Sequence, residues 1–394
     1  PVAFVKFSDR EQEAKAVYYA CRWNLKPSDP AAFAAGKLTT PERPIVFYVD
    51  DTFPAGWYDA IRRGLLSWNA AFEKIGYRDA VQVRPYPRDD ASFDPNDIKF
   101  SCVKYANTMG ESLSSSARID PRSGEILSAT ICIPHNVTSR IRTDLFVQLG
   151  AADPDARRVK MSPELFGKAL AADVARHTGA CLGLAVNYAG SYCVPVDSLR
   201  SPSFTQRYGI SASIMDELPY NLVAQPGDKE RGVALMQQGP GVYDEYVVDW
   251  LYRPVPGAAT PEDEVAELDR RIAARRSDPM CLYTPPPVAV ALDPRSMPYN
   301  PVRAAAYEFA NYAYVMKHAD EWIGEEDADY TFRSLVQASV MNRLYYAFVS
   351  VSANLGGVYL NEKYEGDALP TYLSVPRDLQ RRALRFMLER LEDM

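Results

Sequence analysis

The clearest candidate chemistry lies within residues 173–187, where His177 and Cys181 stand four positions apart. On a helix these two side chains share one face, and an imidazole beside a thiol is the arrangement of a Cys/His nucleophile pair. Leu170 and Val174 fall on the same face, which favours a buried histidine beside a small core cysteine. We therefore expect a structural role for both residues, with the nucleophile pair as the alternative.

Other motifs with a known chemistry are missing from the 394 residues. There is no GxxxxGK[ST] phosphate loop, no GxGxxG dinucleotide turn and no GxSxG nucleophile elbow. The six cysteines form no CxxC pair, and the three histidines are His135, His177 and His318. Lys and Arg total 44 against 51 Asp and Glu, giving a formal charge of −7. With no basic run, this balance argues against nucleic-acid binding.

Apolar patterning predicts the elements that position the 173–187 segment. Strands are expected at Pro44–Asp50, residues 81–84 and 98–105, and in a hairpin formed by Ser116–Ile119 and Glu125–Ile133 around the turn Asp120–Gly124. One amphipathic helix is expected from Trp57 to Phe72. Another runs from Pro163 to about Cys181, because proline favours a helix start and Gly183 stands just past its end.

The second half of the chain changes character. Residues 190–241 are irregular, residues 253–261 and 279–301 are rich in proline, and the region after Pro301 is mostly helical, ending in a helix at Pro376–Leu391. We predict an N-terminal segment at 1–43, a main domain at 44–255 and a Pro-rich linker with a helical region at 256–394.

The first residue is proline, so we interpret the chain as part of a longer precursor. No apolar run reaches the roughly 18–20 residues of a transmembrane span.

The segment Asp173-Val-Ala-Arg-His-Thr-Gly-Ala-Cys-Leu-Gly-Leu-Ala-Val-Asn187 resembles the HExxHxxGxxH active-site segment of the metzincin zinc peptidases. In those enzymes two histidines on one helix face and a third beyond the glycine bind zinc, and the glutamate polarises the bound water. Residues 190–200, 204–209, 213–216 and 221–228 are similar to a bacterial family of exported metallopeptidases with an EcxA-like zinc-binding domain. The resemblance covers roughly residues 20–255.

The resemblance implies an α+β, zincin-like fold with a twisted mixed sheet, an active-site helix and a helical C-terminal region. Met215, in Ser-Ile-Met-Asp, then matches the Met-turn beneath the metal. The strand Glu125–Ile133 resembles the edge strand that pairs with an extended substrate, so an extended peptide or protein segment is the expected partner. An extracytoplasmic location, periplasmic or at the cell surface, is also implied.

The positions that carry the chemistry depart from the family pattern. Arg176 stands at the first ligand position, His177 replaces the catalytic glutamate, and Ala180 and Val186 replace the other two histidines. Gly183 is retained. Arginine has no acceptor, and alanine and valine have no donor atoms for a metal. We therefore expect no zinc and no other cofactor, and an inactive pseudo-peptidase.

Three further interpretations remain open. Arg176 is expected to form an ion pair with Asp173, or with Asp216 or Glu217. Alternatively, its guanidinium fills the vacated metal position or anchors the carboxylate of a ligand, with Arg176 and Asp216 as the candidate ligand-binding residues. The protein as a whole is alternatively a scaffold or interaction module, or a hydrolase that uses Cys181 and His177. Cys102 and Cys132 lie on strands expected to be neighbours, which allows a disulfide between them.

Overall fold

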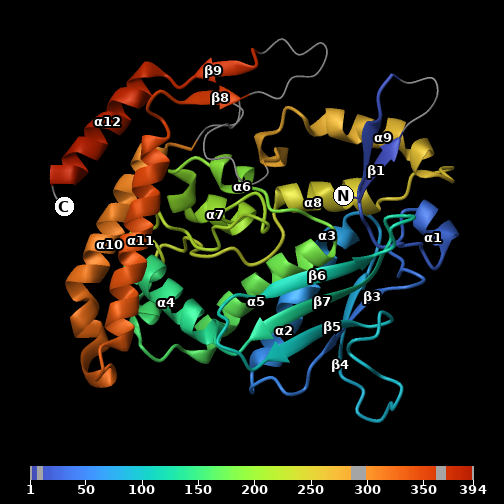
Figure 1. The fold of residues 1–394 in the computed structure, drawn as a ribbon, viewed down its shortest axis with the longest axis horizontal. Helices are drawn as coiled ribbons and strands as arrows, with labels where there is room; N and C mark the ends of the chain where they lie inside the picture. The colour runs from blue at the N-terminus through green and yellow to red at the C-terminus, as the bar shows by residue number, and fades with distance from the viewer. Residues whose placement is uncertain (1, 7–11, 285–298, 361–369, 393–394) are drawn as a thin grey trace. The chain divides into compact units, whose positions relative to one another are not determined.

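The computed structural model describes residues 2–6, 12–284, 299–360 and 370–392 (Figure 1). The chain forms two compact units, each assembled from separate stretches of sequence. The first unit comprises Pro1–Val137, Leu170–Ala185 and Asp244–Arg275, and the second comprises Thr138–Ala169, Val186–Tyr243 and Arg276–Met394. In the part of the chain that is described, no helix has the length and apolar character needed to cross a membrane.

A five-stranded sheet forms the centre of the first unit, in the order β4-β3-β5-β7-β6 (Figure 1). The strands are β3 (Ile45–Val49), β4 (Val81–Pro85), β5 (Ser101–Ala106), β6 (Ser114–Ile119) and β7 (Ile126–Pro134). All neighbouring pairs are parallel except β6 and β7, which form the predicted antiparallel hairpin. Ile45, Phe47 and Val49 are almost fully buried, because alternate side chains of β3 enter the core.

The position of the hairpin in the sheet corrects the predicted edge strand. β7 lies between β5 and β6, so the strand expected at the edge, Glu125–Ile133, is an inner strand. β6 is the edge, and one of its sides has no strand neighbour within the sheet. The expected neighbours Cys102 and Cys132 do lie on adjacent strands, but they are out of register and both are free thiols.

Helices of the first unit pack against this sheet and against one another. They are α1 (Pro30–Ala34), α2 (Trp57–Leu66), α3 (Asn69–Glu73), the second half of α5 (Pro163–Cys181), most of α8 (Val242–Tyr252) and α9 (Pro261–Arg275).

The single helix predicted from Trp57 to Phe72 is wrong, because the chain turns at Ser67–Trp68 between α2 and α3. The buried Trp68 indole instead donates to the Ala175 carbonyl of α5 at 2.8 Å. A hairpin of β1 (Val2–Lys6) and β2 (Lys15–Tyr19) completes the unit.

The second unit is mostly helical, as predicted for the region after Pro301. Its longer helices are α4 (Val137–Leu149), α10 (Pro301–Ile323), α11 (Thr331–Ser352) and α12 (Arg377–Glu392). Shorter elements are α6 (Ala189–Tyr192), α7 (Pro202–Tyr208), the 3-10 turns Pro154–Arg157, Ser198–Arg200, Pro279–Cys281 and Gly324–Glu326, and a hairpin of β8 (Val358–Leu360) and β9 (Tyr372–Ser374). Phe146 of α4, Tyr312 of α10 and Val336 of α11 meet in one buried cluster.

Taken together, the two units give a mixed α and β architecture with a mixed sheet, which agrees with the predicted α+β class. Most of the Pro-rich stretch predicted at 279–301 lies outside the described residues. The predicted division of the chain at residues 43 and 255 stays a prediction.

Candidate functional site

Helix α5 has the start and the end that the sequence predicts. The Ser162 hydroxyl accepts from the Leu165 N–H at 3.2 Å, and Pro163 takes the first helical position, where no N–H is needed. At the other end the Leu184 N–H donates to Gly179 O and the Gly183 N–H donates to Ala180 O. This pair of bonds is the Schellman arrangement, which satisfies carbonyls that the helix itself leaves open.

Gly183 is required at this helix end for two reasons. Its φ of 91° lies in the left-handed region that side chains disfavour. A Cβ at this position would also lie 2.3 Å from the Cys21 carbonyl oxygen, well inside van der Waals contact. The glycine of the metzincin pattern is therefore retained here for backbone geometry, independently of any metal.

Two aromatic side chains of the first unit hold the same helix end. The Trp23 indole donates to Cys181 O at 2.9 Å, and the Tyr252 hydroxyl donates to Leu182 O at 2.6 Å. Burial raises the pKa of Tyr252 above its ordinary value, so the phenol remains a protonated donor. The last carbonyls of α5 are thus satisfied by neutral donors.

Arg176 and His177 lie half-buried on the second half of α5. A nitrogen of the Arg176 guanidinium lies 3.4 Å from His177 Nε2, and His177 Nδ1 lies 3.0 Å from the Ser115 hydroxyl of β6. A guanidinium can only donate, so the Arg176 contact requires Nε2 to accept. The ring proton is then on Nδ1, where it is donated to Ser115. His177 thereby connects α5 to the edge strand of the sheet.

The residues at the positions that the resemblance assigns to the metal ligands do not fit a zinc ion. The nitrogens of Arg176 carry protons and have no free lone pair, and the half-buried Ala180 and Val186 offer no ligand atom. Zinc sites need three or four N, O or S ligands. Within the described residues no group of three His, Cys, Asp or Glu side chains is placed to hold a metal ion.

Cys181 does not have the properties of a nucleophile. The residue is 1% exposed, and burial raises the pKa of its thiol to about 12. At neutral pH the group is therefore a protonated thiol, whereas the reactive species is the thiolate. His177 directs Nδ1 to Ser115 rather than to this sulfur.

The turn Ser213–Asp216 belongs to the second unit and is buried throughout. The Ser213 hydroxyl accepts from the Met215 N–H at 3.0 Å, and Asp216 Oδ2 accepts from the Ser191 N–H at 2.6 Å and from the Ser211 hydroxyl at 3.3 Å. Gly190 lies against this carboxyl, since a Cβ there would be 3.1 Å from Asp216 Oδ2 and 2.6 Å from Ser211 Oγ. Burial raises the pKa of Asp216 to about 7. These contacts indicate that Asp216 orders the turn.

Asn187 joins this turn to the chain that follows α5. Its N–H donates to Met215 O at 3.2 Å, and its side-chain amide donates to Leu282 O at 2.9 Å. Its side-chain oxygen accepts from the main-chain N–H groups of Ala189 and Thr284. The segment next to Val186, which the resemblance predicts to be the third ligand position, is therefore fixed against the 213–216 turn within the second unit.

The sequence predicted α5, the role of Gly183 and the 213–216 turn, but it did not predict the residues that support them. Ser115, Trp23 and Tyr252 come from distant parts of the chain, and their residue types alone gave no sign of these contacts. The pairing of Arg176 with Asp173 or Asp216, and the role of Arg176 and Asp216 in ligand binding, stay predictions.

A family model described as Met-zincin matches residues 158–393, which is more than half of the chain. The matched stretch includes α5, the 213–216 turn and helices α10 to α12. No curated protein and no solved structure matches the chain. The chain belongs to the Met-zincin family and carries a metzincin-like domain of the zinc metallopeptidase type.

Proposed function

We propose that this protein is a pseudo-peptidase, which keeps the metzincin-like fold and has lost both the zinc ligands and the catalytic glutamate. The observation that carries the proposal is the set of side chains on and just after α5. Arg176, Ala180 and Val186 supply no metal ligand, and His177 is engaged with Ser115 in place of a free carboxylate.

The 213–216 turn supports the assignment of a degenerate metzincin site. We assign it as the Met-turn, because Met215 is 2% exposed and follows Ser213-Ile214, as in the family pattern. In this protein Met215 acts as an ordinary core residue. The hydrogen bonds of Asn187 and Asp216 order the turn without a metal.

We further propose that the protein retains a binding site for an extended peptide along β6. The strand is at the edge of the sheet, and only its β7 side is paired within the sheet. A strand edge can bind a peptide through main-chain hydrogen bonds alone, without catalysis. The bond from His177 to Ser115 stabilises β6 from the α5 side.

A metal and activity analysis tests the loss of catalysis. The purified chain is expected to contain less than about one tenth of an equivalent of zinc, and to leave a quenched fluorescent casein substrate intact with and without added zinc. The matched variant restores the family pattern through Arg176→His, His177→Glu, Ala180→His and Val186→His, and is expected to take up about one zinc. Stoichiometric zinc and chelator-sensitive cleavage in the unaltered chain would falsify the proposal.

Peptide binding has its own test, which does not depend on activity. Hydrogen exchange is measured on the protein with and without a pool of unstructured casein peptides. Amides of β6 are expected to gain protection, and those of the inner strand β3 to stay unchanged. Unaltered exchange along β6 at saturating peptide would leave the scaffold or interaction module as the better description.

The hydrolase alternative is disfavoured by the burial of Cys181 and its raised pKa. Native Cys181 is expected to resist alkylation by iodoacetamide at pH 8 and to react only after denaturation. Rapid modification of the native protein at this residue would revive the alternative.

We also propose an extracytoplasmic location from the family resemblance. Recovery of the native protein from the cytoplasmic fraction of fractionated cells would contradict it.

A further inference from the structure

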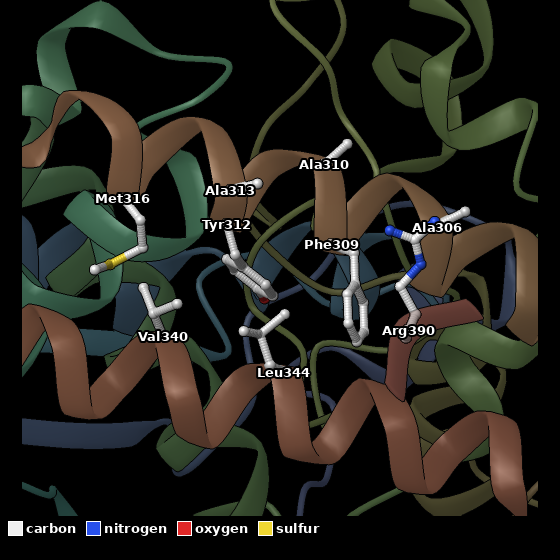
Figure 2. Close-up of a pocket in the computed structure, with 9 residues that line it drawn as sticks. All are labelled: Ala306, Phe309, Ala310, Tyr312, Ala313, Met316, Val340, Leu344 and Arg390. Carbon is white, nitrogen blue, oxygen red and sulfur yellow. The ribbon is translucent and has the colours of Figure 1, made fainter. Parts of the chain in front are cut away.

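A groove in the second unit lies far in sequence from the degenerate site and has a chemistry of its own. It runs between α10 and α11 and is closed at one end by α12 (Figure 2). The cavity has a volume of about 480 Å³, within the range typical of ligand sites.

The walls of the groove are apolar. The floor is formed by Tyr312 and Val340, which are 1% and 2% exposed. One wall is formed by Ala306, Ala310 and Ala313, which recur at helical spacing along α10 and are exposed to solvent. The small alanine side chains leave room between the helices. The Tyr312 hydroxyl is directed to Glu308 at 3.5 Å, so it belongs to the buried side of α10.

The lining residues show that the groove follows helix α10. It extends along α10 from Ala306 to Met316, a rise of about 15 Å for ten residues of helix. Next to the groove, α12 already packs on α10, because its Phe386 and Met387 lie in one cluster with Phe309. An elongated apolar channel of this length suits a single unbranched alkyl chain.

One end of the groove is cationic. Arg390 is the charged residue among the nine described lining residues, and its guanidinium lies 5.6 Å from the Phe386 ring centroid. Figure 2 shows the Arg390 side chain beside Ala306 and Phe309 at one end, with Met316 at the other. Helix α12 contains five arginines and three acidic residues, in a chain whose net charge is −7. The local charge thus favours an anion at this end.

We propose that the groove binds a single-chain amphiphile with a carboxylate head, which is the chemistry of a medium-chain fatty acid. The alkyl chain lies along Ala306, Ala310 and Ala313, because burying each methylene removes apolar surface from water. The carboxylate is held by Arg390, whose planar guanidinium can donate two parallel hydrogen bonds. This function is independent of the zinc positions and of the proposed peptide site.

Calorimetric titration of the full chain with dodecanoate, below the concentration at which it forms micelles, tests the proposal. We expect saturable binding of one molecule per chain. Dodecyltrimethylammonium, which has the same chain and the opposite charge, is expected to bind at least tenfold more weakly. Absence of saturable one-to-one binding, or equal affinity for the two amphiphiles, overturns the proposal.

Variants locate the site. Arg390→Gln is expected to weaken dodecanoate binding at least tenfold, whereas Arg385→Gln, an exposed arginine on the same helix outside the groove, is expected to change it less than twofold. Ala310→Phe fills the groove from an exposed position and is expected to weaken binding at least tenfold. Thermal unfolding checks that each variant folds. Unchanged binding in both Arg390→Gln and Ala310→Phe, or equal losses in the two arginine variants, contradicts the assignment.

Discussion

The end of α5 and the Ser213–Asp216 turn are both held by buried hydrogen bonds, but the groups that make those bonds differ. At the end of α5 the donors among the described residues are neutral: an indole, a phenol and main-chain N–H groups donate to main-chain carbonyls. In the turn the central acceptor is the Asp216 carboxyl, which is 4% exposed. The stability of the two segments should therefore respond differently to pH.

Both supports consist of contacts between groups of the chain itself. The helix end is ordered by the geometry of Gly183 and by the donors Trp23 and Tyr252, and the turn is ordered by Asn187 and Asp216. The hydrogen bonds that order the helix end and the turn do not involve the side chains of Arg176, Ala180 or Val186. Local order in both segments is therefore compatible with residues at those positions that do not fit zinc.

The largest expected effect is at the helix end, in Gly183→Ala. The left-handed backbone and the overlap of the new Cβ with Cys21 O should together lower the free energy of unfolding by about 4 kcal/mol. Gly227→Ala is the matched control, since its φ is 89° and nothing lies within 4 Å of the added Cβ. It should cost only about 1 kcal/mol. Urea unfolding measures both, and equal losses would contradict the role of close packing.

The second prediction concerns how the free energy of unfolding depends on pH through Asp216. The folded state holds the Asp216 proton up to a pKa of about 7, whereas an unfolded aspartate loses it near 3.8. Between these values the folded state binds more protons, so the free energy of unfolding falls as pH rises. This fall amounts to at most about 4 kcal/mol, at 1.36 kcal/mol per pKa unit.

Asp216→Asn tests this pH dependence, because the amide oxygen can still accept the Ser191 N–H. The variant should lose less stability than the unaltered chain between pH 5 and 8, as measured by urea unfolding at each pH. Burial also raises the pKa of Glu308 to about 7, so some decline remains in both proteins. Parallel pH profiles for the two proteins would show that Asp216 is not the source.

A smaller and pH-independent effect is expected for Tyr252→Phe. The variant removes the donor to Leu182 O and should cost about 1–2 kcal/mol, equally at pH 5 and pH 8. Tyr345→Phe, with a side chain 63% exposed, is the control and should be near neutral. A Tyr252→Phe loss that grows with pH would remove the proposed contrast between the two supports.

The smallest effect is expected for Ser115→Ala, at below about 1 kcal/mol, because the bond to His177 is half-exposed. Its readout is nuclear magnetic resonance of the His177 ring. In the unaltered chain Nδ1 should carry the proton. The variant should keep this tautomer, because Arg176 still donates to Nε2, but the Nδ1 shift should change with the loss of its hydrogen-bond acceptor. Unchanged ring nitrogen shifts would mean that Nδ1 does not donate to Ser115.

Both ends of α5 were predicted from the sequence, because Pro163 and Gly183 determine the backbone conformation at the positions they occupy. The hairpin was predicted for the same reason. Its place in the sheet was not, because the order of strands depends on contacts far apart in the chain, and the assigned edge was wrong. The helix from Trp57 to Phe72 was also wrong: both ends of the apolar stripe are buried, but the chain turns at Ser67–Trp68 between them.

In the candidate site, too, local features were predicted and contacts between distant residues were not. Arg176, His177, Ala180 and Val186 were located by the spacing of a motif, which is a local property. The contact of His177 with Ser115 joins residues 62 positions apart, and the groove beside Arg390 joins three helices. Such contacts follow from packing, which residue type and periodicity do not specify.

The discontinuous first unit has a consequence for synthesis. Its sheet strands have all been translated by Pro134, but the unit also needs the last part of α5 and helices α8 and α9, which end at Arg275. About 140 further residues must be translated, which takes roughly 7–30 s at common elongation rates. During that interval the sheet lacks part of its apolar covering, so the nascent chain should be a client of ribosome-associated chaperones.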